Sequence, residues 1–202
     1  MKADGSASPD SLVRCPRGTV EVMYSSDAKW AVCRTQGVSD VYAVSLEDST
    51  APRPILVGPA RTEAPRVSPN GKWRAFQSDE VRGQYDVFVT SFPVPGAHIK
   101  ISINGGQEPL WDRSGRTLYY RTLGKVFAEE MDPATGARTS EPRTVLTGNC
   151  LIHPRNAHQN YDVAADGRFL MVKPVEGGVT TVVAHNWVSE FRGMLAGRKR
   201  EP

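Results

Sequence analysis

The residues best suited to hold a metal lie in one segment, where Cys150, His153 and His158 follow one another at ligand-like spacing. Thiolate and imidazole groups are common zinc ligands, and a loop can bring three of them together. No fourth ligand stands close by in the sequence, and Pro154 and Asn156 are typical of ordinary loops. We therefore assign no metal site and interpret the segment as a connection between structural units. A place above a central channel is the alternative for His158.

Motifs for hydrolysis or phosphoryl transfer do not occur in the sequence. There is no Gly-x-Ser-x-Gly nucleophile elbow, no Gly-rich kinase loop, no His-Arg-Asp loop and no Asp-Phe-Gly. Gly124-Lys125 lacks the other residues of a phosphate loop and fits a hairpin turn. The adjacent pairs Asp79-Glu80 and Glu129-Glu130 would point to opposite faces of a strand, so neither can act as an acid/base pair. We expect no catalytic residue, no cofactor and no enzymatic activity.

One sequence pattern occurs four times along the chain. Pro65 and Gly71 are followed 44 residues later by Pro109 and Gly115. Each unit contains a tight turn, at Asp27-Ala28, Asn70-Gly71, Ser114-Gly115 and Asp166-Gly167. Asn-Gly and Asp-Gly suit hairpins because both central residues tolerate positive φ. The repeated aspartates are expected to order turns rather than to take part in catalysis, namely Asp27, Asp112, Asp162 and Asp166.

Strand-like segments surround each turn. An aromatic or aliphatic run follows the turn, then a β-branched and aromatic strand, and in three units a more polar fourth strand at 54–57, 99–102 and 143–146. Four short strands in about 44 residues are typical of a β-propeller blade. The sequence predicts an all-β fold, a β-propeller or partial propeller of about four four-stranded antiparallel blades. These lie at 18–60, 61–105, 106–148 and 149–185, and a short helix and basic tail occupy 186–202.

The two ends of the chain carry further expectations. Residues 1–17 are expected to be an outer strand that completes another blade or is left over from one, with the strand itself at 11–14. In a closed ring this strand would pair with 180–183, because pairing removes an exposed edge. Otherwise that edge stays open or is covered by the helix expected at 186–195, where Trp187, Phe191 and Leu195 recur with helical spacing.

Several residues that could carry function are instead expected to pack. Trp30, Trp73, Trp111 and Trp187 are interpreted as blade packing, with an exposed aromatic binding surface as the alternative. His98 and His185 are expected within strands as half-buried packing residues. Trp73, Phe76, Val87 and Phe88 are expected in the core of the second blade. Cys15, Cys33 and Cys150 are too few for a disulfide framework, so Cys33 is interpreted as a small core residue, with a Cys15–Cys150 bridge as the alternative.

Two stretches of the repeat resemble known families. Val67-Ser68-Pro69-Asn70-Gly71-Lys72, with Ala75-Phe76 and Asp86-Val87-Phe88, resembles the WD40-like repeat of TolB-type β-propellers, although Ala28 replaces the usual glycine and Asp112-Arg113-Ser114 replaces Ser-Pro-Asp. Residues 161–171 and 182–191 resemble the end of the propeller region fused to many bacterial serine/threonine protein kinases. That resemblance implies an extracytoplasmic propeller beyond a membrane helix.

Composition narrows the function further. The net charge of +3 is too small to indicate nucleic-acid binding, and no apolar run of 18 residues could span a membrane. The first residues do not resemble a secretory signal, so the chain is expected to be cytoplasmic by itself or a piece of a longer protein. We expect a non-enzymatic interaction or sensor module that binds a protein, peptide or small ligand on the propeller face. The alternative is an accessory domain of a peptidase or hydrolase.

Overall fold

The computed structural model describes residues 13–37, 40–48, 51–81, 83–148, 158–164 and 166–171, and these contain strands, turns and loops. We call the four sheets that they form blades 1 to 4. Blade 1 has the order β1 (Thr19–Tyr24), β2 (Trp30–Thr35), β3 (Val41–Ser45), β4 (Arg53–Leu56). Blade 2 has β5 (Thr62–Val67), β6 (Trp73–Ser78), β7 (Asp86–Ser91), β8 (Ile99–Lys100). Blade 3 has β9 (Gln107–Trp111), β10 (Thr117–Thr122), β11 (Lys125–Glu130), β12 (Arg143–Thr147), and the described part of blade 4 has β13 (Tyr161–Val163) and β14 (Phe169–Met171).

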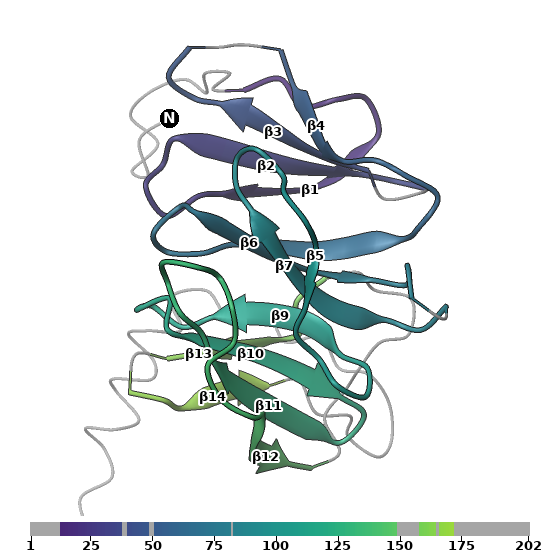
Figure 1. Cartoon of the computed structure of the whole chain (residues 1–202). Helices are drawn as coiled ribbons and strands as arrows, with labels where there is room; N and C mark the ends of the chain where they lie inside the picture. The colour runs from purple at the N-terminus through teal and green to yellow at the C-terminus, as the bar shows by residue number, and fades with distance from the viewer. Residues whose placement is uncertain are drawn as a thin grey trace, which may run out of the picture.

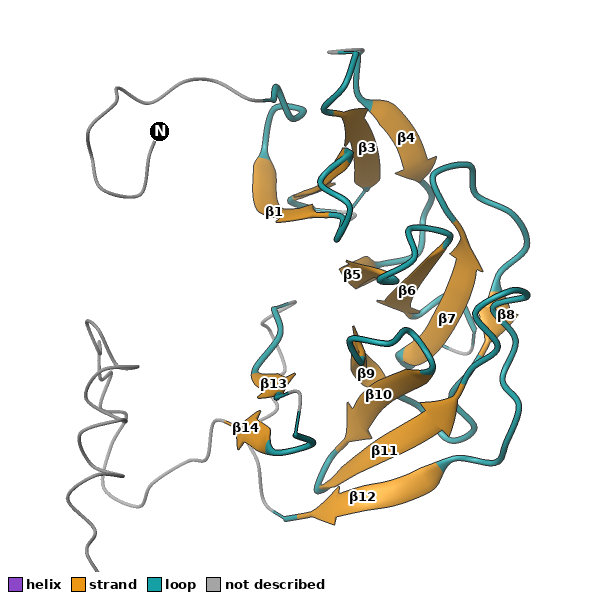
Figure 2. Cartoon of the chain, turned by 90° about the vertical axis from the view of Figure 1, so that its left-hand side faces the viewer, coloured by secondary structure: helices purple, strands orange, loops and turns teal. Residues whose placement is uncertain are grey.

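The blades follow one another along an arc. Figure 1 shows blades 1 to 3 stacked in chain order, and the turned view in Figure 2 shows β13 and β14 beside blade 3. The same view shows β1, β5 and β9 on the inner side of the arc, with β4, β8 and β12 on the outer side. Neighbouring strands within each blade are antiparallel. The predicted all-β propeller fold is confirmed, and so are the second, third and fourth strands expected in the first three blades.

The repeat extends to backbone conformation. Ala28, Gly71, Gly115 and Gly167 all have positive φ, between 55° and 80°. Asp27, Asn70 and Ser114, which precede the first three of them, do not have positive φ, so only one central residue of each turn uses the conformation that both tolerate. Each turn is instead a wider loop, in which the carbonyl of Ser25, Ser68, Asp112 or Ala164 accepts a hydrogen bond from the residue with positive φ. The turn side chains Asp27, Asn70, Asp112 and Asp166 accept bonds from following backbone amides, as predicted for the three aspartates.

Asp162 departs from that prediction. It lies within β13 rather than in a turn, and its carboxylate accepts a bond from the amide of Val163. Because the turn of this unit is already ordered by Asp166, a second aspartate four residues earlier falls on the preceding strand.

Apolar side chains fill the spaces between blades. Between blades 1 and 2, Val32, Val41, Ala43 and Ile55 pack with Phe92. Between blades 2 and 3, a larger cluster contains Ala75, Val87, Val89, Ile101, Trp111, Leu118, Tyr120 and Met131. Phe76, Val87 and Phe88 are buried and Trp73 is half-buried, which confirms the predicted core of the second blade. Trp30 and Trp111 also pack between blades, as expected.

The N-terminal segment corrects two expectations. Cys33 is fully buried in the core of blade 1, as expected. It forms a disulfide with Cys15, with Cα atoms 5.9 Å apart, so the alternative bridge from Cys15 to Cys150 is wrong. Residues 13 and 14 are not in a strand, although a strand was expected at 11–14. Instead, Val13 and Cys15 pack on Ala31 and Val44, on the face of blade 1 that looks away from blade 2. The expected strand at 180–183, its pairing with residue 13 and the helix at 186–195 lie outside the described residues.

Candidate binding face

The junction between blades 1 and 2 and the junction between blades 2 and 3 each have a hollow, and the two hollows have the same place in the repeat. Both include residues of the connection that leaves the outer strand of one blade: Leu56 to Ala60 and Ile103 to Gly105. The junction between blades 3 and 4, near Leu146 and Gly148, has no space for a water molecule among the described residues. Because equivalent strands run in the same direction, these connections lie at the same end of every blade. We call this end of the arc the loop face.

The hollow between blades 2 and 3 is mainly apolar. It has a volume of about 420 Å³ and is lined by Tyr120, Leu123 and Phe127 of the β10–β11 hairpin, with Ile103 and Pro142 opposite. Tyr120 and Phe127 stack with ring centroids 5.3 Å apart, so the floor of the hollow is a fixed aromatic surface. Lys125 and the amide of Asn104 supply polar groups at its edge. Such a surface suits an apolar side chain flanked by polar groups.

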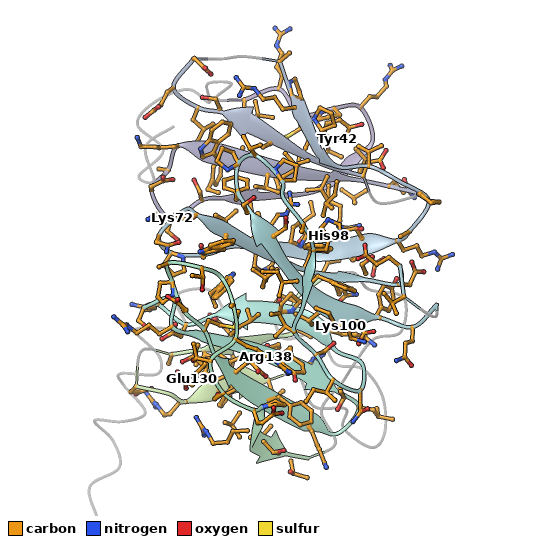
Figure 3. All side chains as sticks on the ribbon, viewed as in Figure 1. Tyr42, Lys72, His98, Lys100, Glu130 and Arg138 are labelled. Atoms are coloured by element: carbon orange, nitrogen blue, oxygen red, sulfur yellow. A yellow bond between two sulfur atoms is a disulfide. The ribbon has the colours of Figure 1, made fainter. Side chains whose placement is uncertain are left out.

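The hollow between blades 1 and 2 has a different chemistry. Its volume is about 290 Å³, and Asp40, Thr62, Glu80 and His98 line it together with the residues from Leu56 to Ala60. Nδ1 of His98 lies 3.0 Å from Oε1 of Glu80. The His98 ring, labelled in Figure 3, packs edge-on against Phe76 at a centroid distance of 5.0 Å. His98 precedes β8 instead of lying within a strand, and the residue is more exposed than the half-buried packing residue that was expected, although its ring rests on Phe76.

A buried polar network lies beneath the loop face and joins blades 2, 3 and 4. Oε1 of Glu108 accepts bonds from Arg121 at 2.7 Å and from the Asn160 side chain at 3.0 Å, and Oε2 accepts from the Asn160 amide. The Glu108 amide donates to Gln77, and the Tyr161 hydroxyl donates to the Glu108 carbonyl. These groups bond to one another, so we interpret the network as a structural tie between blades.

Glu129 is the most unusual carboxylate of the described residues. It is fully buried, neither of its oxygens accepts a hydrogen bond from the described residues, and Nη1 of Arg138 lies 4.0 Å from its Oε1. Burial raises the pKa of Glu129 to about 7, and Arg138 opposes that rise. Its neighbour Glu130, labelled in Figure 3, is exposed. One carboxylate is buried and the next is exposed, so the two side chains point to opposite faces, as expected. Glu129 and Glu130 therefore do not face each other across one site.

The residues singled out in the sequence do not form one site. Gly124-Lys125 is a hairpin turn between β10 and β11, as expected. His158 is exposed, and Cys150 and His153 lie outside the described residues. Within the part of the chain that is described, no group of three His, Cys, Asp or Glu side chains could hold a metal ion. No helix there is long and apolar enough to cross a membrane.

The hydrogen-bond partners of Asp86 and Glu108 were not predicted. Glu108 lies 44 residues after Ala64, so the repeat spacing alone marks the two positions as equivalent. In the structure both have positive φ in the first strand of a blade. The sequence shows the equivalence of the two positions, but it does not show that a left-handed residue at this bulge turns its side chain into the blade junction.

Solved structures with a similar fold are β-propellers. A putative TolB from Agrobacterium tumefaciens matches with a TM-score of 0.51 and 19% identity, over 73% of this chain and 50% of that chain. TolB from Acinetobacter baumannii matches with a TM-score of 0.54 and 15% identity, over 79% and 38%. The tricorn protease matches with a TM-score of 0.51 and 13% identity, over 87% and 20%.

This chain therefore spans half or less of the length of these proteins, and the likeness shows a TolB-type propeller fold. No family model matches the sequence, and no curated protein matches it.

Proposed function

We propose that this chain is a non-enzymatic propeller module that binds a protein, peptide or small ligand on its loop face. The observation that carries the proposal is the pair of hollows at the junctions of blades 1 and 2 and of blades 2 and 3, both on one face. Rigid blades hold such loops in place, and loops on a rigid scaffold commonly carry binding residues. The module would serve as the interaction or sensor part of a larger protein, such as a bacterial serine/threonine kinase, whose propeller region residues 161–171 resemble.

A peptide-display selection on the chain tests this role. Leu123 is 82% exposed beside the hollow between blades 2 and 3, and Leu170 is 70% exposed on β14. We expect selected peptides to lose binding to the Leu123→Asp variant and to keep it with the matched Leu170→Asp variant. No reproducible peptide enrichment, together with no response to panels of small ligands, would contradict the proposal.

The proposed absence of catalysis has its own test. Esterase, peptidase and phosphoryl-transfer substrates are offered to the purified chain, and we expect no turnover above that of the buffer. Turnover that disappears on a point mutation within the chain would show that it is an enzyme.

The alternative is an accessory propeller of a peptidase or hydrolase, and the likeness to the tricorn protease favours it. The reading frame that adjoins the coding sequence separates the two ideas. Kinase motifs in that frame support the sensor module, and a hydrolase nucleophile elbow supports the accessory domain. A propeller in a kinase fusion would be extracytoplasmic.

A further inference from the structure

The aspartate that begins the third strand has different surroundings in blades 1 and 2. Asp86, in blade 2, is buried and fully bonded: Oδ2 accepts from Nζ of Lys100 at 2.7 Å, and Oδ1 accepts from the Ser102 hydroxyl at 2.7 Å and from the Gly105 amide at 3.2 Å. An ammonium, a hydroxyl and an amide thus surround one carboxylate. Blade 2 therefore shows which donors can satisfy an aspartate at this position of a blade.

Asp40 takes the place of Asp86 in blade 1. Tyr42 pairs with Pro54 as Phe88 pairs with Lys100, so Pro54 stands where blade 2 has the ammonium-bearing residue. The buried Ile55 and Ile101 then correspond, and Leu56 stands in the place of the Ser102 hydroxyl. Neither Pro54 nor Leu56 can donate a side-chain hydrogen bond, so blade 1 lacks the side-chain donors that satisfy this carboxylate in blade 2.

One oxygen of the Asp40 carboxylate is left without a partner beside a hollow. Oδ1 of Asp40 is buried and accepts no hydrogen bond from the described residues. The same aspartate lines the hollow of about 290 Å³ between blades 1 and 2. Glu80 adds a second acidic group to the wall, but its oxygens are engaged by His98. A buried acceptor is costly when unpaired, and a charged donor that reached it would form a strong hydrogen bond.

We propose that this hollow binds a primary alkylammonium group, which takes the place at Asp40 that Nζ of Lys100 holds at Asp86. The ammonium donates to the Asp40 carboxylate, and its aliphatic chain lies along Leu56, Val57 and Pro59. Thr62 provides a further polar group at the wall. The inference deepens the proposed binding role of the loop face, but it concerns a different hollow from the one that Leu123 borders, so either can fail while the other holds.

The experiment is an amide chemical-shift titration of the chain at low ionic strength, because salt screens such an interaction. The probes are n-butylammonium and N-acetyl-lysine methylamide, and the neutral control is N-acetyl-Nε-acetyl-lysine methylamide. We expect saturable shifts around Asp40, Ala60 and Thr62 with a charged probe and none with the neutral one. Binding of n-butylammonium alone would indicate a small amine as the ligand, and binding of both charged probes would indicate a lysine side chain of a peptide.

Three variants locate the site. Asp40→Asn should weaken binding at least tenfold, whereas Glu47→Gln, an exposed carboxylate change beyond the opposite end of β3, should leave it unchanged. Pro54→Lys restores the blade 2 pattern and should abolish binding of the probes while raising the melting temperature, because the new ammonium occupies Asp40 from within. The proposal is overturned if no charged probe shifts these resonances, or if Asp40→Asn and Pro54→Lys bind as the original chain does.

Discussion

Ala28 adopts a backbone conformation that the other blades give to glycine. Its φ is 55°, whereas the equivalent positions are Gly71, Gly115 and Gly167. An L side chain in this region costs about 1–2 kcal/mol, which is partly offset by the smaller entropy of the unfolded alanine chain. We expect Ala28→Gly to stabilise the protein by about 0.5–1 kcal/mol in urea denaturation. Gly167→Ala is the converse control, because a Cβ there meets no atom within 4 Å, and it should destabilise by a similar amount. Equal stability of all three proteins would contradict the argument.

Glu129 gives the chain a specific pH dependence. The folded carboxyl keeps its proton up to about its raised pKa of 7, whereas in the unfolded chain it ionises near 4.5. Between these values the unfolded state alone releases the proton, so the free energy of unfolding falls as the pH rises and then levels off above 7. Glutamine is neutral throughout. We expect Glu129→Gln to match the original chain near pH 4 and to exceed its stability by about 1–3 kcal/mol at pH 8. Glu130→Gln, on the exposed neighbour, should leave the profile unchanged, and parallel profiles for Glu129→Gln would contradict the prediction.

At the scale of the strand and the blade, the aromatic pair of blade 2 stabilises the contact with blade 1. Phe76 on β6 is fully buried and stacks on Phe88 of β7 at a centroid distance of 5.7 Å, and the buried Arg74 guanidinium lies 5.5 Å from its ring. Phe76→Ala should therefore cost about 3–5 kcal/mol, measured by urea denaturation. Leu170→Ala, on an exposed leucine, should change stability by less than about 0.5 kcal/mol. A loss below that value for Phe76→Ala would mean that its burial contributes little.

The Cys15–Cys33 disulfide fixes the N-terminal segment on the face of blade 1 that looks away from blade 2. The bridge closes a loop of 18 residues, and a loop of this size is worth about 3 kcal/mol through the entropy of the unfolded chain. We expect a reducing agent to lower the melting temperature of the original chain to that of Cys15→Ser, and to leave the variant itself unchanged. If reduction shifts both proteins equally, the bridge does not carry the stabilisation.

Local patterns predicted the blades better than they predicted contacts between segments. Strands and turns follow from side-chain alternation and from residues such as Asn70-Gly71, which act within a few positions of one another. The disulfide depends on how residues 13–15 cross blade 1, and no local pattern near Cys15 encodes that path. The partners of Asp40 and Asp86 differ because of outer-strand residues 14 to 16 positions away, which only the register of β4 and β8 brings into place.

At the scale of the whole molecule, the Glu108 network ties three blades of the arc together. Arg121 and Glu108 are almost fully buried 2.7 Å apart, and the Arg121 guanidinium lies 5.5 Å from the Tyr161 ring. The hydroxyl of Tyr161 donates to the Glu108 carbonyl, so blade 4 is attached to blade 3 through the same pair. Burial raises the pKa of Tyr161. This hydroxyl therefore stays protonated and able to donate at neutral pH.

Removing one member of that pair should affect more than its own blade. Arg121→Met leaves the Glu108 carboxylate buried without its cation and should cost about 3–5 kcal/mol. Adding Glu108→Gln removes the uncompensated charge and keeps an oxygen for Asn160, so the double variant should recover part of that loss. Amide hydrogen exchange locates the effect: in Arg121→Met, protection should fall at Tyr161 and Val163 while Phe88 and Val89 in blade 2 stay protected. Uniform loss of protection in all blades would show that the arc unfolds as one unit and that the network does not act as a separate tie to blade 4.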